Sequence, residues 1–392
     1  MLIHTQAVPA YVIADPERML PRFWATVWSL SLHGMALAEN TLKRKLRHVD
    51  NFYGFCDSRF GIDSFDAAVS GRDAARTLQM VEAFYLDLTA RPGFNTTAVQ
   101  CWDAVRDFVQ RLARQRASSS QAWDAMSSAL WAMGRLRQPD RGQFRFARSL
   151  PSRTLTDLLQ VAHADSRRNP FRGAQVRMRN WLIVNLLLLA GLRRGELMLL
   201  ECGSLKSDID VDTGDLVYWL DVTETAEFDP RHSAPSIKTG QSHRQVPVSH
   251  DLAHLFEHYA SEARYRNAHH GLLLTSSNGA PLSAESISKI FGVLSRAISA
   301  DALAQFSKRS GGKKRISPHD LRHVCATARY GMFMALAPDR ELAFQRMRAF
   351  FGWSVNSTMP DHYARAAIHD DLLRTWNTLF DERVGVLRGL HA

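Results

Sequence analysis

The sequence predicts a mostly α-helical protein of two domains, with a small antiparallel sheet in the second. Three observations lead to this fold class. The chain has 392 residues, which suits two domains that each bury a core. Apolar residues recur at helical spacing from about residue 17 to 136, and a polar stretch at 137–149 with Pro139 and Gly142 breaks the pattern. Helical segments that flank short, strand-like segments follow the break.

The first domain, residues 1–140, is expected to be a bundle of four or five helices. In residues 40–60, Leu42, Leu46 and Val49 recur at three- and four-residue spacing, with basic residues between them. The same three- and four-residue spacing of apolar residues recurs in residues 73–88, 96–115 and 120–136. The periodicity therefore predicts an all-helical first domain.

The second domain, residues 150–392, is expected to be larger and to carry the sheet. Its strand candidates are residues 215–222, 235–240 and 243–249, with a turn at 239–242. The most apolar run, residues 181–192, contains Asn185 and is too short to span a bilayer, so it predicts a buried helix. Further helices are expected at residues 251–265 and 283–299.

Composition narrows the class of protein. A hydrophobic content of 45% and a charged content of 22% are those of an ordinary globular protein. The net charge of +10 favours a polyanionic partner, nucleic acid first and an anionic membrane surface second, although an ordinary basic protein is the alternative. The four cysteines form no CxxC pair, and the N-terminus shows no secretory signal. We therefore expect a cytoplasmic protein without disulfides, zinc knuckles or a membrane anchor.

The segment HDLRH, residues 319–323, places two histidines four residues apart, as in zinc hydrolases. Ser317 and Pro318 predict a helix start, and Asp320 at the third helical position closes a capping box. Arg322, between the histidines, would repel a dication but would suit an anion at a helix N-terminus. A phosphate site is thus favoured over a metal site or a surface coincidence, and the basic loop at 307–315 fits it.

A second basic element follows the buried helix. Arg193 and Arg194 lie in the turn between two apolar segments within residues 186–205. An arginine at the junction of buried helices needs an anionic partner. That partner is either a ligand or, in the simpler alternative, Glu196.

Five motifs occur in an order that resembles the tyrosine recombinase (phage integrase-like) family. They are AGLRRGEL, IKTGQSHRQVPV, HDLRH, FFGW and MPDHYAR, and the resemblance covers roughly residues 150–370. It implies a tyrosine-recombinase-like fold, with a helical core-binding DNA domain before a catalytic domain. It also implies the catalytic residues, which are Arg193, Lys238, His319, Arg322, Trp353 and Tyr363, with Glu196 as the partner of Arg193.

The resemblance implies that Tyr363 attacks DNA and forms a 3′-phosphotyrosyl intermediate, without metal or ATP. A tyrosine hydroxyl, with a pKa near 10, needs help as a nucleophile. Two arginines on the phosphate would neutralise charge as metal ions do elsewhere. Lys238 matches the general acid for the leaving 5′ oxygen. His319 either accepts the phenolic proton or donates to a phosphate oxygen.

Two features bear on the choice of Tyr363 among eight tyrosines. Tyr330 shares the helix of His319 but lies eleven residues, about 16 Å, further on, so one phosphate cannot touch both. Trp353 stands ten residues before Tyr363, one more than the family pattern. This spacing predicts either a bulged loop or an alignment shifted by one residue.

The expected partner is double-stranded DNA, bound by a homo-oligomer that forms a tetramer in synapsis. Candidate DNA contacts are Lys43, Arg44, Lys45, Lys308, Arg309, Lys313, Lys314 and Arg315. The apolar stripe of the C-terminal helix, with Leu372, Leu373 and Trp376, either completes its own core or packs on a neighbouring protomer. Alternatives to recombination are type IB topoisomerase-like relaxation, catalytically silent DNA binding and zinc-dependent hydrolysis.

Overall fold

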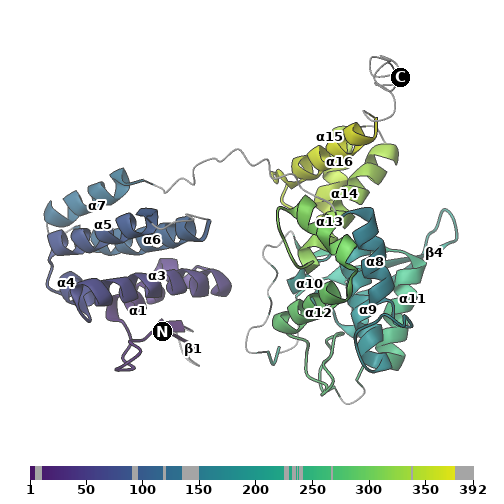
Figure 1. Ribbon diagram of the computed structural model, residues 1–392, viewed down its shortest axis with the longest axis horizontal. Coiled ribbons are helices and arrows are strands. Elements are labelled where there is room, and N and C mark those ends of the chain that lie inside the picture. The colour runs from purple at the N-terminus through teal and green to yellow at the C-terminus, as the bar shows by residue number, and fades with distance from the viewer. Residues whose placement is uncertain are drawn as a thin grey trace, which may run out of the picture. The chain divides into compact units, whose positions relative to one another are not determined.

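The computed structural model divides the chain into two compact units, Met1–Gln143 and Phe144–Ala392, called here the first and second units (Figure 1). The residues that it describes are 1–4, 11–90, 96–117, 121–134, 150–224, 229–231, 235, 237, 242–265, 268–336 and 339–375. The predicted fold class is confirmed, since the described chain is mostly helical and carries a small antiparallel sheet in the second unit. No helix within these ranges has the length and apolar character needed to cross a membrane.

The first unit is a helical bundle to which a short β-ribbon is added. Its helices are α1 (Phe23–Leu30), α2 (Leu32–Met35), α3 (Glu39–Phe60), α4 (Ser64–Ser70), α5 (Ala74–Ala90), α6 (Thr96–Ala117) and α7 (Gln121–Ala132). The ribbon pairs β1 (Leu2–His4) with β2 (Tyr11–Ile13) in antiparallel register. The prediction of an all-helical domain is wrong here, because strands of three residues are too short to give a periodic signal.

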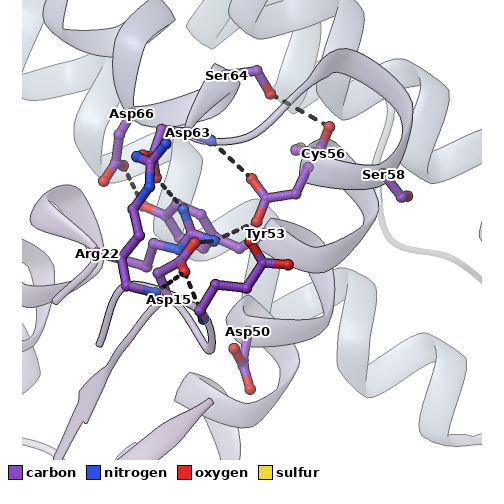
Figure 2. Close-up of polar contacts among 12 residues, drawn as sticks. Asp15, Arg22, Asp50, Tyr53, Cys56, Ser58, Asp63, Ser64 and Asp66 are labelled. Carbon is purple, nitrogen blue, oxygen red and sulfur yellow. Dashed lines mark hydrogen bonds and ion pairs between the residues drawn. The ribbon is translucent and has the colours of Figure 1, made fainter. Parts of the chain in front are cut away.

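A buried arginine just before α1 connects the N-terminal segment of the first unit to its helices (Figure 2). The side chain of Arg22 is 3% exposed and forms ion pairs with Asp15 at 2.9 Å, with Asp57 and with Asp63. Next to it, Tyr53 donates a hydrogen bond of 2.5 Å to Asp66. Since a buried cation is tolerated only when it is paired, these carboxylates fix the chain before α1 against α3 and α4.

The second unit combines helices with a three-stranded antiparallel sheet, in the order β3-β4-β5. The strands are β3 (Leu205–Ile209), β4 (Leu216–Val222) and β5 (Arg244–Val248). The helices are α8 (Ser152–Ala162), α9 (Ala174–Leu189), α10 (Arg194–Leu199), η1 (Cys202–Ser204), α11 (His250–His258), η3 (Tyr259–Ala263), α12 (Ala284–Ala297), α13 (Ala300–Ser310), α14 (Pro318–Leu336), α15 (Arg340–Phe351) and α16 (Met359–Thr375).

The predicted strands agree with the sheet only in part. β4 and β5 lie where strands were expected, whereas β3 was not predicted. Most of the expected strand at residues 235–240 lies outside the described residues, and the two of them that are described are not in a strand. The second half of the apolar stripe expected near the C-terminus, from Trp376 onward, also lies outside the described residues.

Helix α9 is the centre of the second unit and determines where the candidate site lies. As predicted, its apolar run is buried, with Leu182, Ile183 and Leu186 fully shielded from solvent. Helix α14 packs against α9, α15 and α16, and α14, α15 and α16 lie together at one end of this unit (Figure 1). The residues that follow α9, begin α14 and begin α16 are thereby brought together.

Candidate active site

Glu196 is the acid around which the predicted arginines assemble. Arg193 precedes α10 and forms an ion pair of 2.5 Å with Glu196, whose Oε2 also accepts the Arg193 backbone N–H at 2.8 Å. The Glu196 side chain is only 4% exposed, which by itself would raise its pKa. The hydrogen bond and charge of Arg244 and the charges of Arg322 and Arg193 outweigh this burial and lower the pKa of Glu196 to about 2.

Arg322 lies deep in the site, on the first turns of α14. Its side chain is 3% exposed and lies 3.6 Å from the Glu196 carboxylate. It donates hydrogen bonds to the backbone oxygen of Gly191 and, at 2.9 Å, to that of Phe351. Burial lowers the pKa of Arg322 to about 9, with Glu196 opposing the shift, so the guanidinium remains charged at neutral pH. Two segments far apart in sequence thus hold one cation in place.

A third arginine, Arg244 at the start of β5, was not among the predicted site residues. It bonds to Glu196 at 2.9 Å and donates to the Phe350 carbonyl at 2.8 Å, with its side chain 6% exposed. One carboxylate therefore faces three guanidiniums. The sequence did contain a signal for Arg244. It lies two residues before Val246 in a predicted strand, so both side chains face the interior. A cation that faces the interior requires a buried acid as its partner.

Gly191 allows Arg322 and the ring of Phe351 to approach the end of α9. Its φ is +60°, and a Cβ built there would lie 2.5 Å from Phe351 Cε1 and 2.9 Å from Cys325 Sγ. We expect Gly191→Ala to lower the free energy of unfolding by about 1 to 3 kcal/mol, because strain and overpacking add.

Denaturant titration checks this expectation, with Gly203→Ala as the control, since a Cβ at Gly203 would meet nothing within 4 Å. The control is expected to change the stability by no more than about 0.5 kcal/mol. Equal midpoints for the two variants would contradict the close approach at Gly191.

The start of α14 presents His319 at the surface. Ser317 donates to Asp320 through its backbone N–H at 2.8 Å and its hydroxyl at 2.7 Å, and Lys313 pairs with Asp320 at 2.9 Å. Asp320 thus closes the predicted helix start. Partial desolvation first, and then the charge of Arg322, lower the pKa of the exposed His319, so its imidazole is neutral at neutral pH.

Trp353 and Tyr363 meet despite the extra residue between them. Their rings stack with centroids 5.5 Å apart and planes within 5° of parallel. The segment between them contains a turn, in which the Ser357 N–H donates to the Ser354 carbonyl at 2.9 Å. Tyr363 is 1% exposed, and this burial raises its pKa to about 12.

The phenol of Tyr363 has a partner that sequence reasoning did not assign to the site. Its Oη lies 2.8 Å from Nδ1 of His323, the second histidine of HDLRH. The His323 ring also contacts that of His319, with centroids 4.2 Å apart. The motif contained His323, but nothing in the sequence indicated which side chain it would meet, because Tyr363 is on α16, 40 residues away.

Five of the six predicted catalytic residues line one cleft of about 730 Å³. They are Arg193, His319, Arg322, Trp353 and Tyr363, and the cleft wall also includes Arg194, Ser288 and Arg315. The sixth, Lys238, lies outside the described residues. Within those residues, no group of three or more His, Cys, Asp or Glu side chains is placed to hold a metal ion. The cleft is therefore lined by cations and aromatic rings, a combination suited to an anionic ligand.

The predicted DNA contacts lie in both units. In the second unit Lys308, Lys313, Lys314 and Arg315 are exposed and Arg309 is half-buried, at and after the end of α13. In the first unit Arg44 is exposed and, with Lys45, His48 and Arg106, lines a groove of about 360 Å³ on α3 and α6. Lys45 pairs with Asp107 at 2.6 Å, and Lys43 Nζ lies 5.0 Å from the centre of the Tyr11 ring.

Comparison with known proteins agrees with the sequence motifs. The phage integrase family profile matches residues 148–367. Among solved structures, XerA recombinase is 15% identical over 90% of this chain and 97% of its own, with a TM-score of 0.37. The Tn1549 transposon integrase in complex with circular intermediate DNA is 16% identical over 88% of this chain and 99% of its own, with a TM-score of 0.46.

A lambda integrase dimer bound to a core site is 13% identical over 88% of this chain and 95% of its own, with a TM-score of 0.41. No curated protein matches the chain. The family profile covers more than half of the 392 residues and includes every element that lines the cleft. The predicted resemblance is confirmed, and the chain belongs to the phage integrase family of tyrosine recombinases.

Proposed function

We propose that this protein is a site-specific DNA recombinase that cleaves and rejoins duplex DNA through a 3′-phosphotyrosyl link to Tyr363. One observation carries the proposal. Residues from four of the motifs line the same cleft, and among the described ion pairs three guanidiniums, of Arg193, Arg244 and Arg322, share the carboxylate of Glu196. A buried site with excess positive charge is completed by an anion, and a phosphodiester supplies one.

Each side chain has a role in this reaction. Arg193 and Arg322 bind the non-bridging phosphate oxygens and neutralise the charge that accumulates in the transition state. His319, exposed and neutral, donates a hydrogen bond to a phosphate oxygen. Tyr363 Oη attacks phosphorus, the bond to the 5′ oxygen breaks, and Lys238 delivers the proton that this oxygen needs. Attack by a 5′ hydroxyl of another strand reverses the step and completes the exchange.

Trp353 positions the nucleophile in this scheme. Its ring stacks on Tyr363 and on Phe351, whose centroid lies 4.8 Å from that of Trp353. Arg322 lies over the same stack, with Cζ 4.9 Å from the Phe351 centroid and 5.9 Å from that of Trp353. The rings thus fix the nucleophile and one phosphate ligand against a common surface.

The first unit is proposed to be the core-binding domain that holds the duplex. Arg44, His48 and Arg106 on α3 and α6 line one groove, which supports this assignment. Exchange of four strands requires four active tyrosines, so the functional form is proposed to be a tetramer on DNA, with the C-terminal helix either exchanged between protomers or completing its own core.

Covalent trapping tests the proposed function. The protein is mixed, in excess EDTA, with nicked duplexes tiled across the DNA that flanks its own gene, and denaturing gels are searched for a protein–DNA adduct. We expect an adduct at one short site, and peptide mapping is expected to find the nucleotide on Tyr363.

Other outcomes favour the alternatives. DNA binding without any adduct would indicate a silent binder of the same fold. Relaxation of supercoiled plasmid that lacks the site would indicate type IB topoisomerase-like activity. Activity lost to a chelator, with stoichiometric bound zinc, would indicate hydrolysis at HDLRH.

A further inference from the structure

The contact between His323 on α14 and Tyr363 on α16 has no role in the reaction as described so far. His323 Nδ1 and Tyr363 Oη are 2.8 Å apart, within the range of a hydrogen bond. The tyrosine is 1% exposed and the histidine is half-buried, so water does not compete freely for this pair. The phenol oxygen is the atom that would attack the phosphate, and His323 is therefore in contact with a reacting atom.

The direction of this hydrogen bond follows from the surroundings. Burial raises the pKa of Tyr363 to about 12, so the phenol keeps its proton at neutral pH. Among the described residues, the Tyr363 hydroxyl has no other hydrogen-bond partner. A buried hydroxyl with one neighbour donates to it, because the opposite arrangement would leave the phenolic proton unpaired. Nδ1 is thus the acceptor, and the proton of the neutral ring is on Nε2.

We propose that His323 is the general base of the cleavage step, accepting the phenolic proton at Nδ1 as Tyr363 attacks. The assignment rests on the proposed function. As the bond between Oη and phosphorus forms and the bond to the 5′ oxygen breaks, the proton of Oη moves to Nδ1, and the leaving oxygen takes its own proton from Lys238 or water. In religation the 5′ hydroxyl attacks phosphorus and passes its proton to Lys238 or water, while the bond between phosphorus and Oη breaks and the imidazolium returns its proton to Oη.

His319, the family's histidine, is less well placed for this step. It is exposed at the mouth of the cleft, and its ring contacts that of His323 at 4.2 Å between centroids. Its position beside Arg322 and Arg193 suits a donor to a phosphate oxygen. The two roles that sequence reasoning left open for His319 are thereby divided between two histidines.

The proton stays on Tyr363 until DNA is bound. Burial first, and then electrostatic interactions with His319, His362 and Lys313, lower the pKa of His323 to about 4, with Asp320 opposing the shift. The phenol is therefore a far weaker acid than the imidazolium in the free protein, and transfer is unfavourable. A phosphodiester in the cleft adds negative charge, which favours an imidazolium, and bond formation to phosphorus makes the phenol strongly acidic. Proton transfer is thus coupled to the attack.

The variant His323→Asn tests whether His323 acts as a base or only positions the phenol of Tyr363. The asparagine oxygen can accept the phenolic hydrogen bond near the place of Nδ1 but cannot hold a proton. We expect it to form the covalent adduct about 10²- to 10⁴-fold more slowly than wild type, the usual range for loss of a general base. His362→Asn is the matched control, since His362 neighbours Tyr363 without a hydrogen bond to its hydroxyl among the described contacts.

A second variant tests the chemistry directly. When Tyr363 is replaced by 3,5-difluorotyrosine, whose phenol is more acidic, the need for a base falls. We expect this replacement to restore most of the rate lost in His323→Asn. A purely structural role of His323 would give no such rescue, because the acidity of the phenol would not matter.

The outcomes separate this assignment from the proposed function. No adduct with wild type would overturn both, whereas a wild-type adduct with equally fast cleavage by His323→Asn would overturn the assignment alone. Nitrogen NMR of selectively labelled histidine gives a readout that needs no DNA. The neutral His323 ring is expected to carry its proton on Nε2, and a proton on Nδ1 would contradict the proposal.

Discussion

Replacing Tyr363 with phenylalanine is expected to abolish the covalent protein–DNA adduct, a loss of at least about 10⁴-fold in the cleavage rate. The substitution removes the oxygen proposed as the nucleophile but keeps the ring that stacks on Trp353. It leaves His323 Nδ1 without its partner, which lowers the free energy of unfolding by only about 1 kcal/mol. Activity is therefore expected to be lost while most of the stability is kept. Adduct formation measures the activity, and thermal melting measures the stability.

The chain offers a matched control for this substitution. Tyr330 is 5% exposed, packs against Phe344 on α15 and does not line the cleft. Tyr330→Phe is expected to keep adduct formation within about twofold of wild type, since it removes a hydroxyl far from the phosphate. An adduct that persists in Tyr363→Phe but is lost in Tyr330→Phe would mean that the nucleophile was wrongly assigned.

Glu196→Gln is expected to give the largest loss of stability in the second unit, about 3 to 5 kcal/mol. The change leaves Arg244 and Arg322, with side chains 6% and 3% exposed, without their only anionic neighbour among the described ion pairs. Denaturant midpoints at neutral pH measure the effect. Glu257→Gln, at a side chain that is 57% exposed, is the control and is expected to change stability by no more than about 0.5 kcal/mol.

The same carboxyl predicts a pH dependence with a definite sign. The pKa of Glu196 is about 2 in the folded protein and 4.5 in its ordinary state, so the folded state favours the carboxylate. Its contribution, about 3 kcal/mol, is fully present above pH 4.5 and is lost as the pH falls towards 2. Glu196→Gln should lack this loss, and a variant whose acid sensitivity equals that of wild type would contradict the assignment.

The helices, and the residues that line the cleft, could be predicted from the sequence more completely than the sheet. α3 carries apolar residues at helical spacing and lies where it was expected, whereas α9 carries a continuous apolar run and overlaps the buried helix expected at residues 181–192. β3 was missed because its residues are exposed or half-buried, so it is held by backbone pairing with β4 and carries no inward-facing apolar pattern. A strand of this kind has no alternation of apolar and polar residues by which the sequence could predict it.

The site shows where motif reasoning stops. Arg193, His319 and Arg322 could be named because each belongs to a short motif, and all three line one cleft. Arg244 and His323 were missed because their roles depend on partners on other elements, Glu196 in one case and Tyr363 in the other. Such pairs arise only when the chain folds, and one sequence does not contain that information.

The two carbonyl groups that hold Arg322 lie at the carboxyl ends of helices. That of Phe351 ends α15, and that of Gly191 comes just after α9. The macrodipole of a helix places about half a negative charge at this end. Unlike Glu196, these poles cannot be neutralised by acid, so they keep Arg322 oriented even where the carboxylate is protonated. The orientation of Arg322 and the balance of its charge are therefore supplied by different parts of the fold, and one can be lost without the other.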